Sequence, residues 1–319
     1  MYLFKYILKR IGLMLMTFFI ITTICFVLVK MLPSLPAEQF GKDMAIIMQR
    51  REQLGYNLPI MQQYFRFWKY AFQGNFGVSE VLYIGQDVWS VFVSKLPYTV
   101  ALNLYSILLS IPLGIGLGIF AALKKNTWID HLISTGVMIV VSVPSFIYAF
   151  LVQYFLYFKL GITSATMDTS MGALSWVGFK SMIPAILSMS FGTIAGFARY
   201  TRAELVEVLT SEFMLLARTK GLTKAQATIR HAMRNAMVPI FPMILGEFVS
   251  IMSGSLIIEE MFTIPGVGKL YVSSIQASPP DYNFFMLLSA FYTLIGLTAG
   301  IIIDISYSII DPRIRMGAK

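Results

Sequence analysis

Charged residues are scarce in this chain of 319 residues: they make up 13% of it, whereas hydrophobic residues make up 57%. In a soluble globular domain about a quarter of the residues are charged. The deficit excludes a water-exposed surface over most of the chain and favours one that faces lipid. The net charge is +9. Because the basic residues flank apolar runs, the positive-inside distribution of membrane proteins explains this charge better than a nucleic-acid partner does.

Cysteine and histidine are nearly absent as well. The single cysteine, Cys25, lies inside the first apolar run, which excludes a disulfide framework. His131 and His231 are far apart in the sequence, with no cysteine or carboxylate at ligand spacing, so no metal site is predicted. We find no glycine-rich phosphate loop and no nucleophile paired with a base. No catalytic residue is predicted, and the chain is not expected to be an enzyme.

Six apolar runs are each long enough to cross a bilayer, which takes about 20 residues. They cover residues 11–29, 96–123, 132–158, 181–198, 235–258 and 282–310. We interpret the first as a retained span, since no small-residue cleavage site follows Val29. Gly114, Gly116 and Gly118 stand at every second position of the second run, where small residues let helices approach closely. The predicted fold is all-α and polytopic, with about six transmembrane helices.

Lysine and arginine are distributed unevenly among the connections. The loop at Lys124 and Lys125 and the stretch 199–234 hold nine of them, and the opposite short loops hold three. Both termini are basic as well, so the positive-inside rule predicts that both lie in the cytoplasm. We therefore predict a first span with a cytoplasmic N-terminus (residues 1–30), a small ordered extracellular lobe (31–95) and a five-helix core (96–319) with a cytoplasmic loop at 199–237.

That cytoplasmic loop is too long and too regular for a simple connector. It contains an apolar helical stretch, a glycine at Gly221 and then a polar restart. Phe213, Leu216 and Ala217 are predicted to share one helix face. The pattern indicates a short helix on the membrane surface, a turn at Gly221 and a second helix.

This segment resembles the EAA loop of binding-protein-dependent ABC permeases, and more narrowly that of the dipeptide/oligopeptide permease family. The matching residues are Ala217-Arg218-Thr219-Lys220-Gly221-Leu222, then His231-Ala232-Met233-Arg234-Asn235-Ala236 and Pro239. Further family-like segments occur in order along the whole chain, at residues 6–10, 75–79, 258–262, 265–270, 304–307 and 311–315. The family usually has an acidic start to the EAA loop, whereas this chain has Leu215 and Leu216 there.

The resemblance implies a type I ABC importer permease in a bacterial plasma membrane. It implies a second homologous permease subunit, two cytoplasmic ATPase subunits that carry ATP and Mg, and an extracellular peptide-binding protein; this chain itself would bind no cofactor. Oligopeptides are the expected cargo, with dipeptides, nickel or a metal chelate as alternatives. Coupling to the ATPase would fall to a set of residues in the loop: Phe213, Leu216, Ala217, Arg218, Lys220, Gly221 and Leu222. A stand-alone secondary transporter is the alternative from another class, but we detect no inverted repeat.

Acidic residues in or beside the apolar runs are the other candidates, because an ionisable group in a span is costly. Glu247 would line the translocation path and meet a peptide's amino terminus, or pair with a neighbouring helix or subunit. Glu259 and Glu260 would shape an outer gate or simply be solvated. Asp304 would make a structural tie to Arg199, Arg313 or Arg315.

Overall fold

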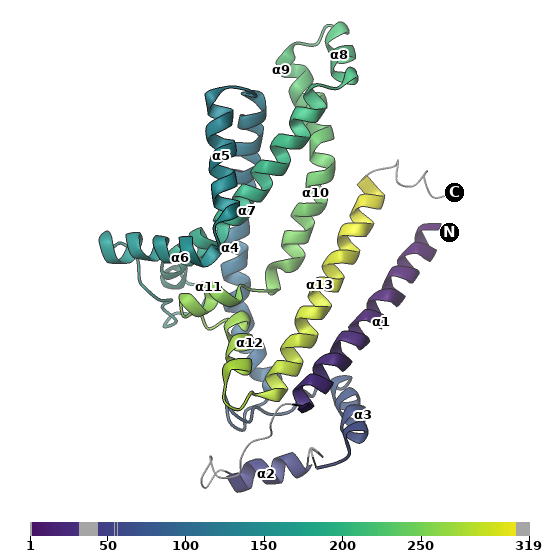
Figure 1. The fold of residues 1–319 in the computed structure, drawn as a ribbon, viewed down its shortest axis with the longest axis vertical. Helices are drawn as coiled ribbons and strands as arrows, with labels where there is room; N and C mark the ends of the chain where they lie inside the picture. Colours follow the sequence, from purple (N-terminus) through teal and green to yellow (C-terminus); the bar gives the residue numbers. More distant parts are fainter. Residues whose placement is uncertain (1, 32–43, 54, 56, 311–319) are drawn as a thin grey trace. The chain divides into compact units, whose positions relative to one another are not determined.

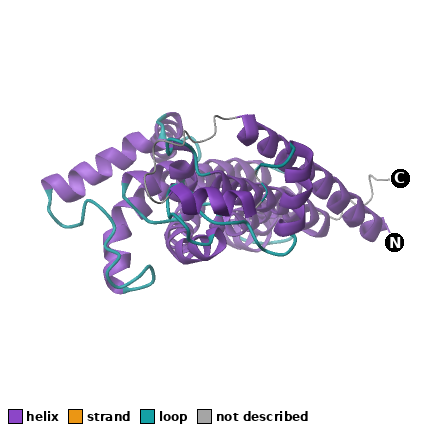
Figure 2. Ribbon diagram, turned by 90° about the horizontal axis from the view of Figure 1, so that it is seen from below, coloured by secondary structure: helices purple, strands orange, loops and turns teal. Residues whose placement is uncertain are grey.

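The computed structural model describes residues 2–31, 44–53, 55 and 57–310. Throughout this part of the chain the regular structure is helical, apart from one isolated bridge between Val78 and Asp87 (Figure 2). The helices, labelled in Figure 1, are α1 (Tyr2–Met31), α2 (Met44–Gln53), α3 (Ile60–Ala71), α4 (Val88–Leu123), α5 (Trp128–Ser142), α6 (Ser145–Gln153), η3 (Tyr154–Lys159), α7 (Trp176–Leu209), α8 (Glu212–Thr219), α9 (Lys224–Ala227), η4 (Thr228–Ala232), α10 (Met233–Val249), η5 (Ser250–Met252), α11 (Leu256–Met261), α12 (Val267–Gln276) and α13 (Tyr282–Ile310).

Membrane-length helices dominate the described residues. Five are long and apolar enough to cross a bilayer, and a bent pair supplies a sixth crossing if it counts as one span. The five are Lys5–Met31, Val88–Leu123, Trp176–Leu209, Ala225–Met252 and Tyr282–Tyr307. The prediction of an all-α polytopic protein with about six spans is confirmed.

The bent pair is the predicted third span. Helices α5 and α6 meet at an angle of 101° (Figure 1). Pro144 causes the break, because a proline disfavours helical geometry in the residue before it. Val143 accordingly has extended angles, φ −93° and ψ 127°, and Pro144 becomes the N-cap of α6.

Helix ends differ from the apolar runs. Helix α7 continues through polar residues to Leu209, eleven positions beyond the predicted end at Ala198, and α4 begins at Val88 rather than Leu96. Hydropathy marks the part of a helix that sits in lipid, whereas backbone hydrogen bonding continues wherever residues such as Glu204 favour helix. The predicted fifth run is interrupted instead, since α10 ends at Val249 and Gly254 has φ +64°.

The chain forms two compact units. Unit 1 contains Met1–Thr99 and Ser253–Thr298, and unit 2 contains Val100–Met252 and Ala299–Lys319. This division cuts across the three consecutive segments expected from the sequence. Helix α8 of the predicted coupling loop belongs to unit 2, whereas α11, which carries Glu259, belongs to unit 1.

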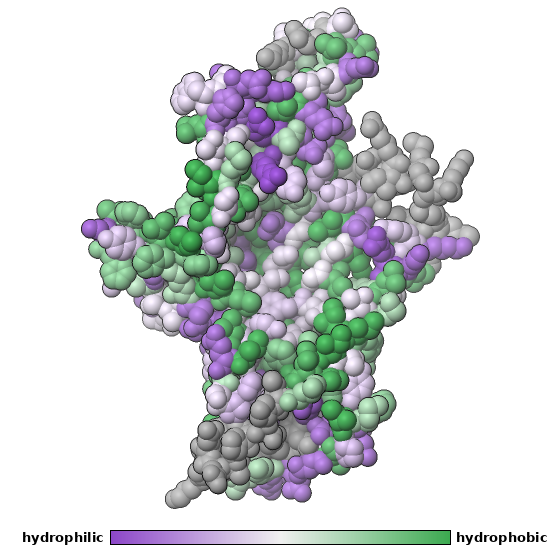
Figure 3. All heavy atoms as spheres, viewed as in Figure 1, coloured by the Kyte–Doolittle hydropathy of each residue, from purple (hydrophilic) through white to green (hydrophobic). Residues whose placement is uncertain are grey.

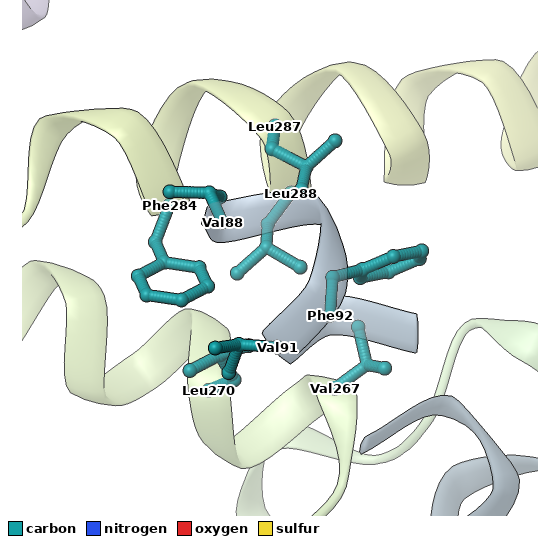
Figure 4. Packing of buried hydrophobic residues seen from close by; sticks show 8 residues of the cluster. All are labelled: Val88, Val91, Phe92, Val267, Leu270, Phe284, Leu287 and Leu288. Atoms are coloured by element: carbon teal, nitrogen blue, oxygen red, sulfur yellow. The ribbon is translucent and has the colours of Figure 1, made fainter. Parts of the chain in front are cut away.

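An apolar cluster holds unit 1 together. Side chains from the start of α4, from α12 and from α13 meet in it, as Figure 4 shows. Its buried members are Val88, Val91, Phe92, Val267, Leu270, Phe284, Leu287 and Leu288. Asp281, itself wholly buried, ties the loop before α4 to this cluster: its Oδ2 accepts hydrogen bonds from the Ser79 hydroxyl (2.5 Å) and the Val81 N–H (3.1 Å).

The predicted outer segment packs on the first span. Helix α3 lies along α1, where Trp68 packs on Phe19 with ring centroids 4.5 Å apart and Tyr64 packs on Phe26 at 5.4 Å. The Tyr64 hydroxyl also hydrogen-bonds the Thr23 hydroxyl at 2.7 Å. The aromatic residues of α3 therefore attach this helix to α1.

Unit 2 is packed through small residues. A Cβ atom on Gly114 would lie 2.7 Å from Phe197 Cβ, and one on Gly118 would lie 2.6 Å from Thr201 Cβ, so α4 and α7 approach too closely for any side chain there. Gly116, between them, has open space. Two glycines four positions apart thus form the contact face of α4, the small-xxx-small arrangement of membrane helices.

Candidate functional site

A hairpin between α7 and α10 carries the segment singled out in the sequence. It contains α8, a turn, α9 and η4 (Figure 1). Gly221 lies in the turn with φ +88°, a left-handed conformation that L side chains rarely adopt. The next helix starts with a capping box: the Thr223 N–H donates to Gln226 Oε1 (3.1 Å), and the Gln226 N–H donates to Thr223 Oγ1 (3.3 Å). The predicted helix–turn–helix is present in the structure.

One face of α8 is fixed to the rest of unit 2. Met214 and Ala217 are buried in a cluster with Leu205 of α7 and Ala122 of α4. Alanines from the returning arm of the hairpin and the start of α10 complete this cluster, which we call the hairpin core: Ala227, Ala232 and Ala236. Small side chains on facing helices allow close packing, so a displacement of α8 must also move α4 and α7.

The other face of α8 is apolar and exposed. Leu215 and Leu216 are 62% and 57% exposed, and Phe213, also exposed, packs edge-on against the His231 ring at 6.4 Å. Adjacent exposed apolar side chains at the tip of a hairpin are a feature of protein interaction sites. Lys220 beside them is exposed, and Leu222 packs partly against the hairpin core. The side chain of Arg218 lies outside the described residues.

The prediction that Ala217 shares one helix face with Phe213 and Leu216 is wrong. The sequence placed it on one face with Phe213 and Leu216, but it is buried with only 7% of its surface exposed. In an eight-residue helix the packed face is decided by the neighbours, and here the pair Met214 and Ala217 faces inward. Ala217 therefore contributes to anchoring α8 and not to its exposed surface.

A partly buried ion pair joins α5 to α7 in the same unit. Arg202 donates from Nε to Asp130 Oδ1 (2.5 Å) and from Nη2 to Oδ2 (2.7 Å), the two-pronged geometry that suits a carboxylate. Asp130 is 1% exposed and also accepts the Asn126 N–H at 3.0 Å. Because Leu205 of the hairpin core follows Arg202 by one helical turn, the pair braces the base of the hairpin. This pair was not predicted from the sequence, where its one signal is an acid, Asp130, just before an apolar run.

Glu259 of unit 1 lies in a nest of donors. Its side chain is wholly buried, its Oε1 accepts the Thr99 hydroxyl (2.8 Å), and its Oε2 accepts the Lys269 N–H (2.9 Å). Thr99 Oγ1 accepts the Val267 N–H in turn (2.8 Å). The carboxyl thus satisfies backbone donors at the N-terminus of α12, where a helix favours negative charge. It fixes α11, α12 and α4 to one another.

Glycines make room for that carboxyl. A Cβ on Gly254, Gly266 or Gly268 would press on the Glu259 carboxyl group. Burial raises the pKa of Glu259 to about 7, although the hydrogen bonds from the Lys269 N–H, the Thr99 hydroxyl and further backbone donors lower it. Because the Glu259 side chain is buried, the expected alternative of a solvated acid is wrong for this residue, and its part in an outer gate stays a prediction.

Glu260 behaves as the sequence suggested for a solvated acid. Its side chain is about half exposed and lies 3.8 Å from the Lys269 ammonium, measured from Oε2 to Nζ. An exposed ion pair of this length contributes little to stability. Two adjacent glutamates therefore have different environments, one buried under α12 and one at the surface.

Two family models together match most of the chain. Residues 114–316 match the family described as binding-protein-dependent transport system inner membrane component, and residues 3–103 match the N-terminal family of the same membrane components. The chain belongs to the binding-protein-dependent transport system inner membrane components. As such a component it is a multi-pass membrane protein, and the hairpin and the Glu259 nest both lie within the matched ranges.

Curated relatives of this transport-system component align over nearly the whole chain. The dipeptide transport system permease protein of Lactococcus lactis subsp. cremoris is 32% identical, covering 98% of this chain and 99% of that protein. The one from Bacillus subtilis is also 32% identical, over 99% of both chains. The glutathione transport system permease protein of Escherichia coli K12 is 31% identical, over 98% of this chain and 99% of that protein.

A solved structure supports the fold of this component. A crystal structure described as an amino acid ABC transporter with histidines matches with a TM-score of 0.51 and 18% identity. The match covers 69% of this chain and 94% of that one. At this identity the likeness establishes the fold alone.

The remaining acids of the component occupy helices. Glu247 is partly buried on α10, and its side chain forms no hydrogen bond or ion pair within the described ranges. Its predicted role in the path or in pairing stays a prediction. Asp304 is partly buried on α13, Arg199 is exposed on α7, and Arg313 and Arg315 lie outside the described residues. The expected tie of Asp304 to one of these arginines likewise stays a prediction.

Proposed function

We propose that this chain forms one half of the transmembrane path of an ATP-driven importer of peptides. The observation that carries the proposal is the family match from residue 3 to residue 316, interrupted only at 104–113, which includes the whole hairpin between α7 and α10. Relatives named for dipeptide and glutathione transport support a peptide-type cargo. Oligopeptides are the proposed substrates, and dipeptides are the alternative that the relatives favour.

The proposed orientation puts both termini and the α8 hairpin in the cytoplasm. Lys124 and Lys125 follow the end of α4, whose Ala122 packs in the hairpin core, so these basic residues and the hairpin are at the same end of unit 2. Figure 3 shows hydrophilic residues gathered on this end, where α5 begins. Lysine and arginine concentrate on the cytoplasmic side of membrane proteins.

Helix α8 is the proposed contact with an ATPase subunit. Phe213, Leu215 and Leu216 would enter an apolar groove, and Lys220 would lie at its rim among acidic side chains. The buried face of α8 would transmit the motion, because Met214 and Ala217 are packed against α4 and α7. Closure of the ATPases around ATP would then tilt these helices as a rigid body and alternate access to the path.

The proposed complex contains four other chains. A second homologous permease would complete the path, two ATPase subunits would bind ATP and Mg, and an extracellular binding protein would deliver the peptide. This stoichiometry is inferred from the resemblance to peptide permeases. Glu247 is a proposed polar contact of the path, since a partly buried acid on a span is costly without a functional or structural partner.

The test is uptake by the complete complex in proteoliposomes that hold ATP inside. Labelled peptides of two to five residues are offered with the binding protein, and nickel with and without a chelator is offered in parallel. We expect peptide uptake that stops when ATP is replaced by a non-hydrolysable analogue. Uptake of nickel without any uptake of peptides would show that the cargo is nickel and not a peptide. Uptake by this chain without ATPase subunits, driven by an ion gradient, would overturn the importer assignment itself.

A further inference from the structure

Unit 1 contains a pocket at the boundary of the membrane. The last turn of α1, the helix α3 and the first residues of α13 line about 650 Å³ of space, counting the open mouth. Two of these helices, α1 and α13, are membrane spans, and they end and begin here, at Met31 and Tyr282. The pocket therefore lies at the depth where lipid headgroups are found.

Two basic side chains line this pocket. Lys30 and Arg66 both line it, and no aspartate or glutamate occurs among the described residues of its wall. The Lys30 ammonium lies 5.7 Å from the centre of the Phe26 ring. The Arg66 guanidinium lies against Gly55, where a Cβ would overlap it, so the glycine permits this placement. Two cations beside one cavity suit a phosphate group.

The pocket changes from polar to apolar along its wall. Besides the cations it is lined by the side chains of Tyr70 and Tyr282, which belong to the amphipathic type found at membrane interfaces. Phe26, Val29 and Met286, which form a buried apolar cluster, continue the wall toward the spans. A molecule that fits such a wall has an anionic group next to a hydrocarbon part.

The outer face of α3 indicates lipid beside the pocket. Phe65 of α3 and Phe72, the residue directly after α3, are 66% and 75% exposed, although other aromatic residues of α3 pack on α1. Aromatic side chains this exposed on a helix bound to a span are stable in a bilayer interface and costly in water. The neighbourhood favours a membrane lipid over a soluble phosphate compound.

We propose that this pocket binds the headgroup of an anionic phospholipid, with its phosphate between Lys30 and Arg66. In the proposed orientation the lipid belongs to the outer leaflet. The inference rests on the membrane spans and the pocket, and it holds whether the transported cargo is a peptide or not.

The experiment uses the complete transporter in nanodiscs of phosphatidylcholine that contain a trace of photoactivatable phosphatidylglycerol. We expect the phosphatidylglycerol to label α1, α3 or α13 near the pocket. In the variant Lys30→Gln/Arg66→Gln, apparent affinity should fall about 25-fold, since each direct hydrogen-bonded contact of a cation with the phosphate contributes about fivefold. The matched control is Lys69→Gln on the exposed side of α3, where labelling should be unchanged.

Two further arms distinguish recognition of the lipid's charge from misfolding and from binding of free anions. The charge-conserving variant Lys30→Arg/Arg66→Lys should keep most of the labelling, which shows that the loss in the glutamine variant reflects charge and not misfolding. Photoactivatable phosphatidylcholine should label the pocket weakly. Equal labelling by both lipids, unchanged labelling in the glutamine variant, or complete displacement of the lipid by inorganic phosphate at millimolar concentration would overturn the proposal. The last result would identify a site for free anions.

Discussion

Arg202 holds Asp130 with two hydrogen bonds, from Nε to Oδ1 at 2.5 Å and from Nη2 to Oδ2 at 2.7 Å, and so joins α7 to α5. The Asp130 side chain is 1% exposed, whereas the Arg202 side chain is about a third exposed. A buried carboxylate that loses such a partner remains as an uncompensated charge. The pair is therefore more important for keeping these helices together than an ordinary surface ion pair.

Removing the cation should destabilise unit 2. We expect Arg202→Gln to lower the free energy of unfolding by about 2 kcal/mol, a value below that for fully buried pairs because water reaches the guanidinium. Thermal unfolding in detergent measures it, and Arg199→Gln, an exposed arginine one turn earlier, is the control. The double variant Asp130→Leu/Arg202→Leu should recover part of the loss. Equal effects of Arg199→Gln and Arg202→Gln would contradict the bracing role of the pair.

The glycines of α4 should tolerate alanine unequally. At Gly114 and Gly118 an added Cβ would lie within 2.7 Å of atoms of α7, and at Gly116 it meets nothing. We expect Gly114→Ala and Gly118→Ala to cost about 1–3 kcal/mol each through overpacking. Gly116→Ala should be neutral or stabilising, since alanine favours helix by up to about 1 kcal/mol. Each variant adds one methyl group to the parental chain. Similar melting temperatures for all three would exclude the close contact between α4 and α7.

Substitutions at Gly221 should act only through the backbone conformation of the turn. Gly221 has φ +88° and free space around it, so an alanine there costs only the left-handed conformation, about 1–2 kcal/mol. We expect limited trypsin cleavage after Lys220 to increase in the order Gly221→Asn, Gly221→Ala, Gly221→Val, because asparagine tolerates this conformation best. Gly161→Ala, at another left-handed glycine with free space, should leave cleavage at Lys220 unchanged. Equal cleavage in all Gly221 variants would show that the turn does not depend on glycine.

Glu259 should make stability depend on pH. Burial raises its pKa from 4.5 to about 7, so the folded chain binds a proton that the unfolded chain has lost. This contribution is fully present below about pH 4.5, decreases as the pH rises to about 7 and is level above that, a change on the order of 3 kcal/mol. Glu259→Gln should remove this part of the pH dependence, seen as a difference in melting temperature that varies with pH. Glu260→Gln, at the exposed neighbour, should leave the pH dependence unchanged. If the difference in melting temperature between Glu259→Gln and the parental chain is constant from about pH 4.5 to about pH 8, the raised pKa of Glu259 is contradicted.

Composition and charge placement were enough to predict the spans, because lipid selects residues one by one along a helix. The turn at Gly221 was also predictable, since a glycine between two helical stretches has a local meaning. Tertiary neighbours decide the rest. Glu259 and Glu260 are adjacent and chemically identical, and only the packing of α11 under α12 buries the first and exposes the second.

Asp130 and Arg202 show the same limit over a longer distance. They are 72 positions apart, and no local pattern relates them. Ala217 shows it within one turn, because Met214 and Ala217 became the packed face of α8 through the alanines that meet them. The sequence predicted a helix at this place correctly, and the side on which it is anchored could be learned only from the structure.

The proposed coupling through α8 is the central claim, and peptide uptake by the complete complex in proteoliposomes tests it most directly. Leu216→Asp places a charge on the exposed apolar face of α8, and we expect ATP-driven uptake to fall at least about tenfold, as for an interface anchor. Lys125→Asp places the same charge at the same end of unit 2, outside α8, and uptake should remain near the parental rate. Parental uptake by a Leu216→Asp complex present at normal levels in the membrane would contradict the proposed coupling.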